Sequence, residues 1–128
     1  MHDSKMPDAS QLLRRKQFEA NEKERRVVLL STMIRDFDNM IVELDRHIAA
    51  EEDRTRIKDT GHLAYSTFAT AAAKRRLNQL STVAHTKSML DVARRELHEL
   101  RVQLRDLENN HSPLAPAGST PDAISALR

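Results

Sequence analysis

Cysteine and tryptophan are absent from this chain of 128 residues, and only two glycines and four prolines occur in it. The absence of cysteine excludes disulfide bonds and thiol catalysis, and is consistent with a cytosolic protein. Aromatic residues make up only 3% of the chain, although a globular core of this size normally uses large aromatic side chains to fill its volume. We therefore expect at most one domain, with a thin hydrophobic core.

Neither sign of charge dominates the sequence. Twenty-one basic and 19 acidic residues give a net charge of +2, and nucleic-acid binding usually needs a one-sided basic field. The longest aliphatic run is VVLL at residues 27–30, and the N-terminal MHDSKMPDAS is polar. These features predict neither a membrane span nor a secretory signal. A content of 31% charged residues is typical of long exposed helices or a coiled coil.

Two series of apolar residues recur with alternating steps of three and four, which is the heptad pattern of one helix packed lengthwise on another. No proline interrupts residues 8–112, so this whole range can be helical. The first series is Val27, Leu30, Ile34, Phe37, Ile41, Leu44 and Ile48. The second series is Val83, Thr86, Leu90, Ala93, Leu97, Leu100, Leu104 and Leu107. Leu77 and Leu80 are out of phase with the second series, which predicts a register slip between residues 80 and 83.

Gly61 lies between the two series and predicts where the chain turns back. KDTG at residues 58–61 is expected to end a first helix at about Ile57, with Gly61 in the left-handed conformation. Ser66 or Thr67 is expected to cap a second helix that reaches about Asn109. The predicted fold is all-α, an antiparallel two-helix coiled-coil hairpin over residues 10–109 with its turn at about 58–66. One long helix in a parallel dimer is the alternative, which Gly61 and the out-of-phase series disfavour.

The tip and the two ends of the chain complete the expected organisation. Leu63, Tyr65 and Phe68 are expected to cover the tip of the hairpin. Residues 1–9 and the Pro/Ala/Ser-rich tail at 110–128 are expected to be disordered. The last segment of the tail, STPDAISALR, starts like a helix but is too short to be helical alone, so folding on a partner is the alternative to a disordered end.

The sequence predicts no catalytic, cofactor-binding or metal-binding residues. His47 and Glu51 lie one helical turn apart, and Asp59 and His62 flank the turn, but neither pair belongs to a larger ligand set. We interpret these side chains as solvated. An active site also needs a concave pocket, which a two-helix hairpin hardly provides, so the chain is not expected to be an enzyme.

Basic residues form clusters that are interleaved with glutamates, at residues 14–16, 23–26, 74–76 and 94–95. Ion pairs between residues four apart, such as Glu22–Arg26, would explain them as a solvated helix face. The alternative is a docking surface for an acidic partner on the open half of the hairpin. The candidate residues for that surface are Arg15, Lys23, Arg25, Arg26, Arg94 and Arg95. RNA binding is disfavoured because no aromatic residues lie among the basic ones.

The VVLL stretch predicts a second kind of contact. If Val27 and Leu30 point toward the other helix, then Val28 and Leu29 point outward. Met33 and Met40 flank the apolar series. A cluster of apolar side chains on the outside of a thin hairpin indicates a partner, either a second copy or a different protein. Looser packing of the hairpin is the alternative.

Two segments resemble the FliJ family, and most closely its alphaproteobacterial members. They are RRKQFEANEKERR at residues 14–26 and IAAEEDRTRIKDTGHLAYSTFATAAAKRRLNQL at residues 48–80, within a resemblance that covers residues 10–107. The resemblance implies an antiparallel two-helix coiled coil that is a soluble, non-enzymatic, stalk-like adaptor and regulator of flagellar type III protein export. A Pro/Ala/Ser-rich tail takes the place of further helical turns of that family.

The same resemblance implies partners and a location. The implied partners are the hexameric export ATPase, the cytoplasmic domain of the export-gate membrane protein, and export chaperones. The implied location is the cytoplasm, peripheral at the cytoplasmic face of the inner membrane. A homo-oligomeric coiled-coil scaffold is the alternative function, and a weak nucleic-acid binder is a more remote one.

Overall fold

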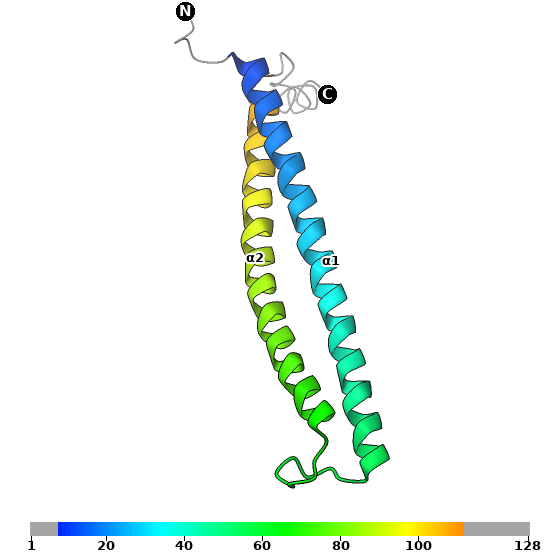
Figure 1. Cartoon of the computed structure of the whole chain (residues 1–128). Coiled ribbons are helices and arrows are strands. Elements are labelled where there is room, and N and C mark those ends of the chain that lie inside the picture. Colours follow the sequence, from blue (N-terminus) through cyan, green and yellow to red (C-terminus); the bar gives the residue numbers. More distant parts are fainter. Residues whose placement is uncertain (1–7, 112–128) are drawn as a thin grey trace, which may run out of the picture. The chain divides into compact units, whose positions relative to one another are not determined.

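The computed structural model describes residues 8–111, which form two α-helices and no strand. α1 spans Ala9–Thr55 and α2 spans Thr67–His111 (Figure 1). The helices pack against each other as an all-α helical hairpin, which confirms the predicted fold class. No helical stretch within residues 8–111 is long and apolar enough to cross a membrane.

The predicted disorder of the two ends falls mostly outside the described residues. Residues 1–7 and 112–128 are not among them. Of the residues expected to be disordered, Ala9, Asn110 and His111 are helical instead. The start of α1 and the end of α2 therefore extend slightly further than predicted, whereas α1 ends two residues before Ile57.

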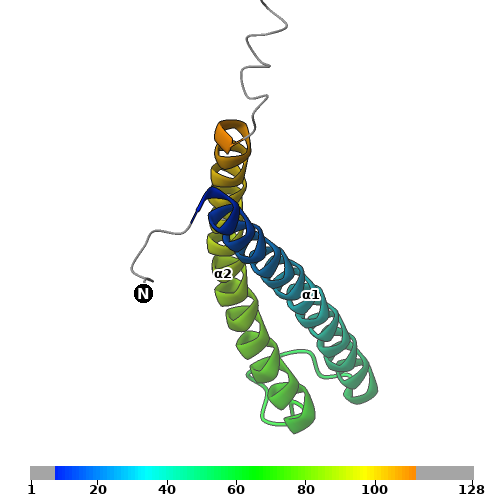
Figure 2. The same ribbon diagram turned by 90° about the horizontal axis from the view of Figure 1, so that it is seen from above.

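The hairpin divides into two units, which are described separately. One unit is Arg26–Ala93, and it contains the connector at residues 56–66 together with the parts of α1 and α2 that adjoin it. In this unit the two helical segments lie side by side with the connector at one end (Figures 1 and 2). The other unit contains the beginning of α1, up to Arg25, and the end of α2, from Arg94.

The predicted heptad positions form the core of the Arg26–Ala93 unit. Leu30, Leu90 and Ala93 form a buried cluster, against which four apolar side chains pack. These four are Val27, Met33, Ile34 and Met89. Nearer the connector, Ile41, Leu44, Val83 and Thr86 are buried, so the predicted packing surface is confirmed.

The predicted register slip in α2 is wrong. Ala69 and Ala72 are buried at 0% and 5% exposure, whereas Leu77 and Leu80 are exposed at 64% and 39%. From Val83 toward the connector, the steps of four and three continue without a break to those two alanines. The expectation failed because it took the large apolar residues as core positions, whereas small residues hold the register here.

Arg56, not Gly61, ends α1. The helix stops at Thr55, and Arg56 takes the left-handed conformation with φ 62°. Gly61, the one glycine within residues 8–111, does not have a positive φ. The Arg56 amide donates to the carbonyl oxygen of Glu52 at 2.7 Å and so closes the last turn. Gly61 lies in a turn in which its amide donates to Asp59 Oδ1 at 3.0 Å. The prediction that Gly61 stops the helix is therefore wrong.

Both helices begin at a side-chain cap. Asp8 Oδ1 accepts a hydrogen bond from the Gln11 amide at 2.7 Å, and Gln11 Oε1 accepts one from the Asp8 amide at 3.3 Å. This reciprocal pair is a capping box. Ser66 Oγ accepts from the Ala69 amide at 3.1 Å, so of the two predicted caps, Ser66 and Thr67, it is Ser66 that caps the second helix.

The tip of the hairpin is covered less than predicted. Leu63 is fully exposed and Phe68 is 54% exposed, so these two side chains do not shield it. Tyr65 is half-buried, and its hydroxyl donates to Glu52 Oε2 at 2.7 Å. Polar contacts between α1 and the end of the connector, rather than apolar cover, hold the tip together.

Candidate functional site

Two ion pairs join α1 and α2 in the unit that contains the beginning of α1 and the end of α2. Lys23 Nζ lies 2.7 Å from Glu96 Oε1, and Arg101 Nη2 lies 3.3 Å from Glu24 Oε2. The first pair places the turn of α2 that carries Arg94 and Arg95 beside the turn of α1 that carries Lys23. Lys23 and the basic cluster at residues 94–95 therefore lie close together.

Two of the predicted partner-binding residues already have acidic partners within the hairpin. Lys23 is paired with Glu96, and Arg25 is paired with Glu22 on its own helix. The predicted pairing of Glu22 with Arg26 is wrong, because Glu22 pairs with the residue three positions later instead of four. Such exposed pairs are individually weak, so a strongly acidic partner could still displace them.

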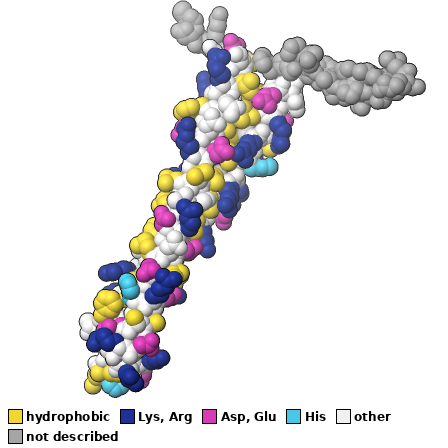
Figure 3. Space-filling view, turned by 90° about the vertical axis from the view of Figure 1, so that its right-hand side faces the viewer, with side chains coloured by type: hydrophobic (Ala, Val, Ile, Leu, Met, Phe, Trp, Pro, Cys, Tyr) yellow, Lys and Arg dark blue, Asp and Glu magenta, His cyan; other side chains and the backbone are white. Residues whose placement is uncertain are grey.

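Three other predicted residues of this unit present free positive charge. Arg15, Arg94 and Arg95 are exposed, and none of them forms an ion pair with another residue of the 8–111 range. Figure 3 shows, however, that basic and acidic side chains alternate along the displayed face. The binding of an acidic partner by these arginines stays a prediction, and it would depend on discrete ion pairs rather than on a one-sided field.

The remaining predicted residues belong to the Arg26–Ala93 unit. Val28 and Leu29 are 59% and 56% exposed, next to the buried Leu30 at 2%. The prediction that both point outward is confirmed. Consecutive helical residues are rotated by about 100°, so Val28 and Leu29 lie on opposite flanks of the packing surface. Arg26 is exposed and, within residues 8–111, has no ion pair.

On the Leu29 flank, apolar side chains continue along both helices, and we call this flank the methionine face. Helical spacings of four and seven residues put Leu29, Met33, Met40 and His47 on one side of α1. The α2 residues of this face include Phe68, whose ring centroid lies 6.2 Å from that of His47, and Met89, which packs with Met33 on the Leu30 cluster. The methionine face consists of Leu29, Met33, Met40, His47, Phe68, Met89 and Val92.

On the Val28 flank lies a smaller apolar surface, which we call the valine face. Val42 is two heptads beyond Val28 and is 46% exposed. Across the hairpin, Leu77 and Leu80 are the exposed leucines of α2, and an ion pair of 2.5 Å between Arg76 Nε and Asp45 Oδ1 lies on the same flank. The valine face consists of Val28, Val42, Leu77 and Leu80.

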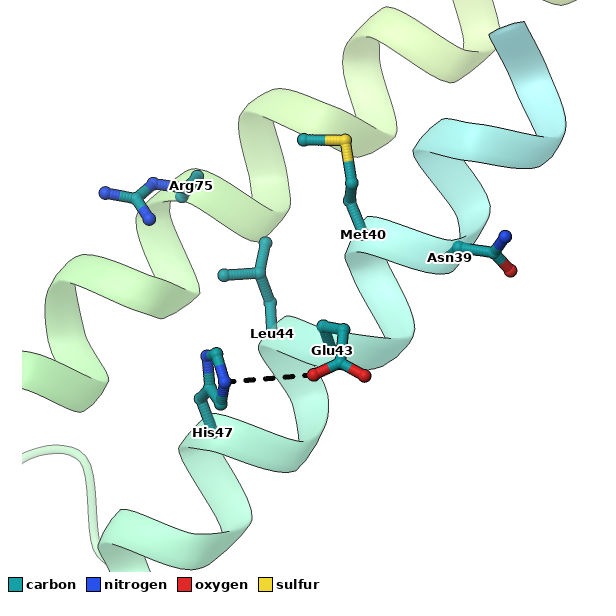
Figure 4. A pocket seen from close by; sticks show the side chains of 6 residues that line it. All are labelled: Asn39, Met40, Glu43, Leu44, His47 and Arg75. Carbon is teal, nitrogen blue, oxygen red and sulfur yellow. Dashed lines mark ion pairs between the residues drawn. The ribbon is translucent and has the colours of Figure 1, made fainter. Parts of the chain in front are cut away.

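A groove of about 300 Å³ opens within the methionine face (Figure 4). Its lining residues are Asn39, Met40, Glu43, Leu44, His47 and Arg75. His47 and Glu51, which lie one helical turn apart, have different ionic neighbours: His47 Nε2 lies 3.8 Å from Glu43 Oε1, and Glu51 pairs with Arg54. Within residues 8–111, no group of three or more side chains is arranged to hold a metal ion. The groove is apolar, with one carboxylate and one guanidinium at its rims.

Glu43 and Arg75 were missed by the sequence reasoning. Each is exposed and lies in a charged helical segment, where nothing in the composition separates it from its neighbours. The signal that could have found them is heptad phase, since both adjoin the same flank as Met40 and His47.

Comparison with protein-family models, with curated proteins and with solved structures gives no match for this chain.

Proposed function

We propose that this chain is a non-enzymatic, stalk-like adaptor and regulator of flagellar type III protein export. The observation that carries the proposal is that the hairpin leaves Val28 and Leu29 more than half exposed beside Arg26, which has no ion pair within residues 8–111. A helical hairpin that only needed to fold would have little use for such side chains on its outside. The likeness of residues 14–26 and 48–80 to the FliJ family supplies the biological context.

Contact with a partner would recover free energy that the hairpin alone does not gain. Each half-exposed Val or Leu contributes about 1 kcal/mol when a partner covers it. Arg15, Arg94 and Arg95 would add charge-assisted hydrogen bonds to carboxylates. Binding would thus combine an apolar contact with discrete ion pairs, and the second component would weaken with salt.

We propose three partners on the basis of the likeness to the FliJ family. They are the hexameric export ATPase, the cytoplasmic domain of the export-gate membrane protein, and export chaperones. In this proposal the hairpin docks between the ATPase ring and the gate, in the cytoplasm at the inner face of the inner membrane. Its role there is mechanical and regulatory, and no chemistry is assigned to it.

Capture of defined partners tests the proposal directly. Tagged full-length chain should retain the export ATPase and the gate domain from a lysate of the source organism, as identified by mass spectrometry. Val28→Glu, and the triple change of Arg15, Arg94 and Arg95 to Glu, should each weaken binding of the purified ATPase or gate domain by about tenfold or more. Lys74→Glu is the matched control, because Lys74 is exposed and has no ion pair within residues 8–111.

Deletion of the gene gives the decisive cellular result. The proposal predicts loss of motility and restoration by the wild-type chain. A deletion strain that swims normally and carries a full set of flagella would refute it, whatever the chain binds in a lysate.

A further inference from the structure

We infer that the methionine face binds a second copy of this chain, with α1 of one copy lying on α2 of the other. This inference does not depend on the export function, because it concerns the purified chain alone. It also separates the two residues of VVLL that point outward, since it assigns Leu29, but not Val28, to contact between copies.

The apolar part of the face has no partner within the hairpin. Leu29 and Phe68 are 56% and 54% exposed, and Met40 and Val92 are each 44% exposed. Between them, Met33 and Met89 are half-buried against the Leu30 cluster. Methionine side chains are flexible and adapt to an opposing surface, so this strip is suited to packing on another helical face.

The charges at the groove identify a second copy as the occupant. Arg75 is exposed and forms no ion pair within residues 8–111. Within residues 8–111, the ion pairs of Glu43 are both with its own helix, to Arg46 Nη1 at 2.8 Å and His47 Nε2 at 3.8 Å. Figure 4 shows the Arg75 side chain pointing away from Glu43. One face therefore offers an acceptor on its α1 rim and a donor on its α2 rim, which is the complementarity that two identical faces need.

The heights of these residues along the hairpin fit a two-fold axis parallel to the helices. Asp45 and Arg76 bond directly across the hairpin. Because the helices are antiparallel, Glu43 and Arg75 are offset in height by about three residues, or about 4.5 Å, which a long arginine side chain can span. Such an axis puts α1 of one copy over α2 of the other without changing height. Glu43 then faces Arg75 of the second copy, and the same ion pair forms twice.

The apolar residues match in the same arrangement. Leu30 packs with Leu90 across the hairpin, which places Leu29 level with Val92 and Met33 level with Met89. Each of these α1 residues then meets its α2 counterpart in the second copy. A two-fold axis across the helices would instead lay α1 on α1 and bring the acids Asp36 and Glu43 of the two copies together, so charge repulsion disfavours it.

The size of the face predicts a weak, reversible dimer. From Leu29 to His47 the face is about 27 Å long at a rise of about 1.5 Å per residue, and about 20 Å wide across two helices. Each copy would bury about 500 Å², near the lower limit for a specific interface. We expect a dissociation constant of about 1–100 µM.

Sedimentation velocity of the full chain over a range of concentrations tests the dimer and its face. Wild type should change from monomer to dimer within that range. Leu29→Glu and Met40→Glu should raise the dissociation constant about tenfold or more, whereas Val28→Glu and Val42→Glu, matched in exposure on the valine face, should leave it unchanged. Circular dichroism of each variant checks that the helices are retained. A wild-type chain that stays monomeric throughout, or a dimer lost with the valine-face variants only, would overturn the inference.

Mixing charge variants tests the arrangement without any assumption about folding within one copy. Glu43→Arg alone would place an arginine opposite Arg75 at both contacts of the dimer. Arg75→Glu alone would place a glutamate opposite Glu43 at both contacts. Repulsion between like charges should keep each variant monomeric at concentrations where wild type is dimeric. An equimolar mixture of the two restores both attractive pairs and should form a heterodimer. An effect confined to one hairpin cannot be repaired by mixing. Failure of the mixture to associate would sink the proposed pairing, even if the chain captured export proteins.

Discussion

Ser66 Oγ donates a hydrogen bond to Glu51 Oε2 at 2.7 Å while it accepts one from the backbone amide of Ala69 at 3.1 Å. One hydroxyl thus caps α2 and ties it to the last turn of α1. Arg54 holds the same carboxylate through two hydrogen bonds of 2.9 and 2.7 Å. Ser66 is buried at 9% exposure, so this small polar cluster closes the hairpin where apolar cover is lacking.

Ser66→Ala should destabilise the hairpin. The change removes the cap of α2, which is worth about 1–2 kcal/mol, and leaves Glu51 without its bond to the second helix. Urea unfolding followed by far-UV circular dichroism measures the loss. Ser81→Ala is the control, since Ser81 is an exposed residue inside α2, and this change should slightly favour the helix. Equal effects of the two substitutions would contradict the capping role.

Glu51 should make stability depend on pH in the acid range. Hydrogen bonds from Arg54, and then from Ser66, hold the pKa of Glu51 at about 2, below its ordinary value of 4.5. A carboxyl group with a lowered folded-state pKa stabilises the fold above its unfolded pKa. That contribution is complete above about pH 4.5 and is lost as the pH falls toward 2.

Glu51→Gln isolates this contribution. The variant should melt at a lower temperature than wild type at neutral pH, because glutamine cannot form the charged contact with Arg54. Below pH 4.5 the two melting temperatures should converge as the wild-type carboxylate is protonated. Thermal unfolding of both proteins across this pH range provides the measurement. A difference that stayed constant down to pH 2 would show that Glu51 is not bonded in this way.

The extended packing surface was predictable from the sequence, whereas its continuation near the connector was not. Large apolar residues at steps of three and four marked Leu30, Leu90 and Leu97, all of which are buried. At Ala69 and Ala72 the same periodicity is carried by residues that also occur on helix exteriors. Leu77 looked more like a core residue than either alanine did, and composition could not decide between them.

The end of α1 shows a second limit of the sequence. Gly61 is the residue that most easily takes a positive φ, but the chain uses Arg56 for that conformation. A single arginine carries no such signal, and only the backbone geometry of the folded chain shows it. The capping box of Asp8 and Gln11, by contrast, could have been found from the spacing D-x-x-Q.

Arg56→Gly should therefore stabilise the hairpin, contrary to the usual effect of glycine. Relief of the left-handed strain is worth about 1–2 kcal/mol, and the greater freedom of glycine in the unfolded chain offsets about 0.4–1 kcal/mol of it. The reciprocal change Gly61→Ala should be neutral or slightly stabilising, since the new Cβ meets only Asp59 Oδ1 at 3.5 Å. Urea unfolding of both variants checks this. A stabilising Gly61→Ala beside a destabilising Arg56→Gly would mean that Arg56 does not need its positive φ.

The sequence predicted which apolar residues of the candidate site are exposed, but not that they lie on two separate faces. Sequence spacing placed Val28 and Leu29 on the outside, and both are exposed. It treated them as one cluster, although the helical rotation between neighbours separates them onto two flanks. Which charged side chains of α2 lie beside each flank of α1 depends on how the two helices are aligned. Contacts such as Asp45–Arg76 show that alignment, and the sequence does not.

Gln79 breaks the apolar character of the packing surface, and its replacement should stabilise the hairpin. It lies in phase with Val83 and Ala72, and its Oε1 is buried without a hydrogen-bond partner. A buried acceptor without a partner costs about 1–3 kcal/mol, and leucine at this position would also bury more apolar area. Gln79→Leu should therefore raise the free energy of unfolding by about 1–3 kcal/mol, as measured by urea unfolding. The exposed neighbour Asn78 provides the control, since Asn78→Leu should change stability only by the small difference in helix propensity. A Gln79→Leu variant no more stable than that control would show that the glutamine oxygen finds a partner in solution.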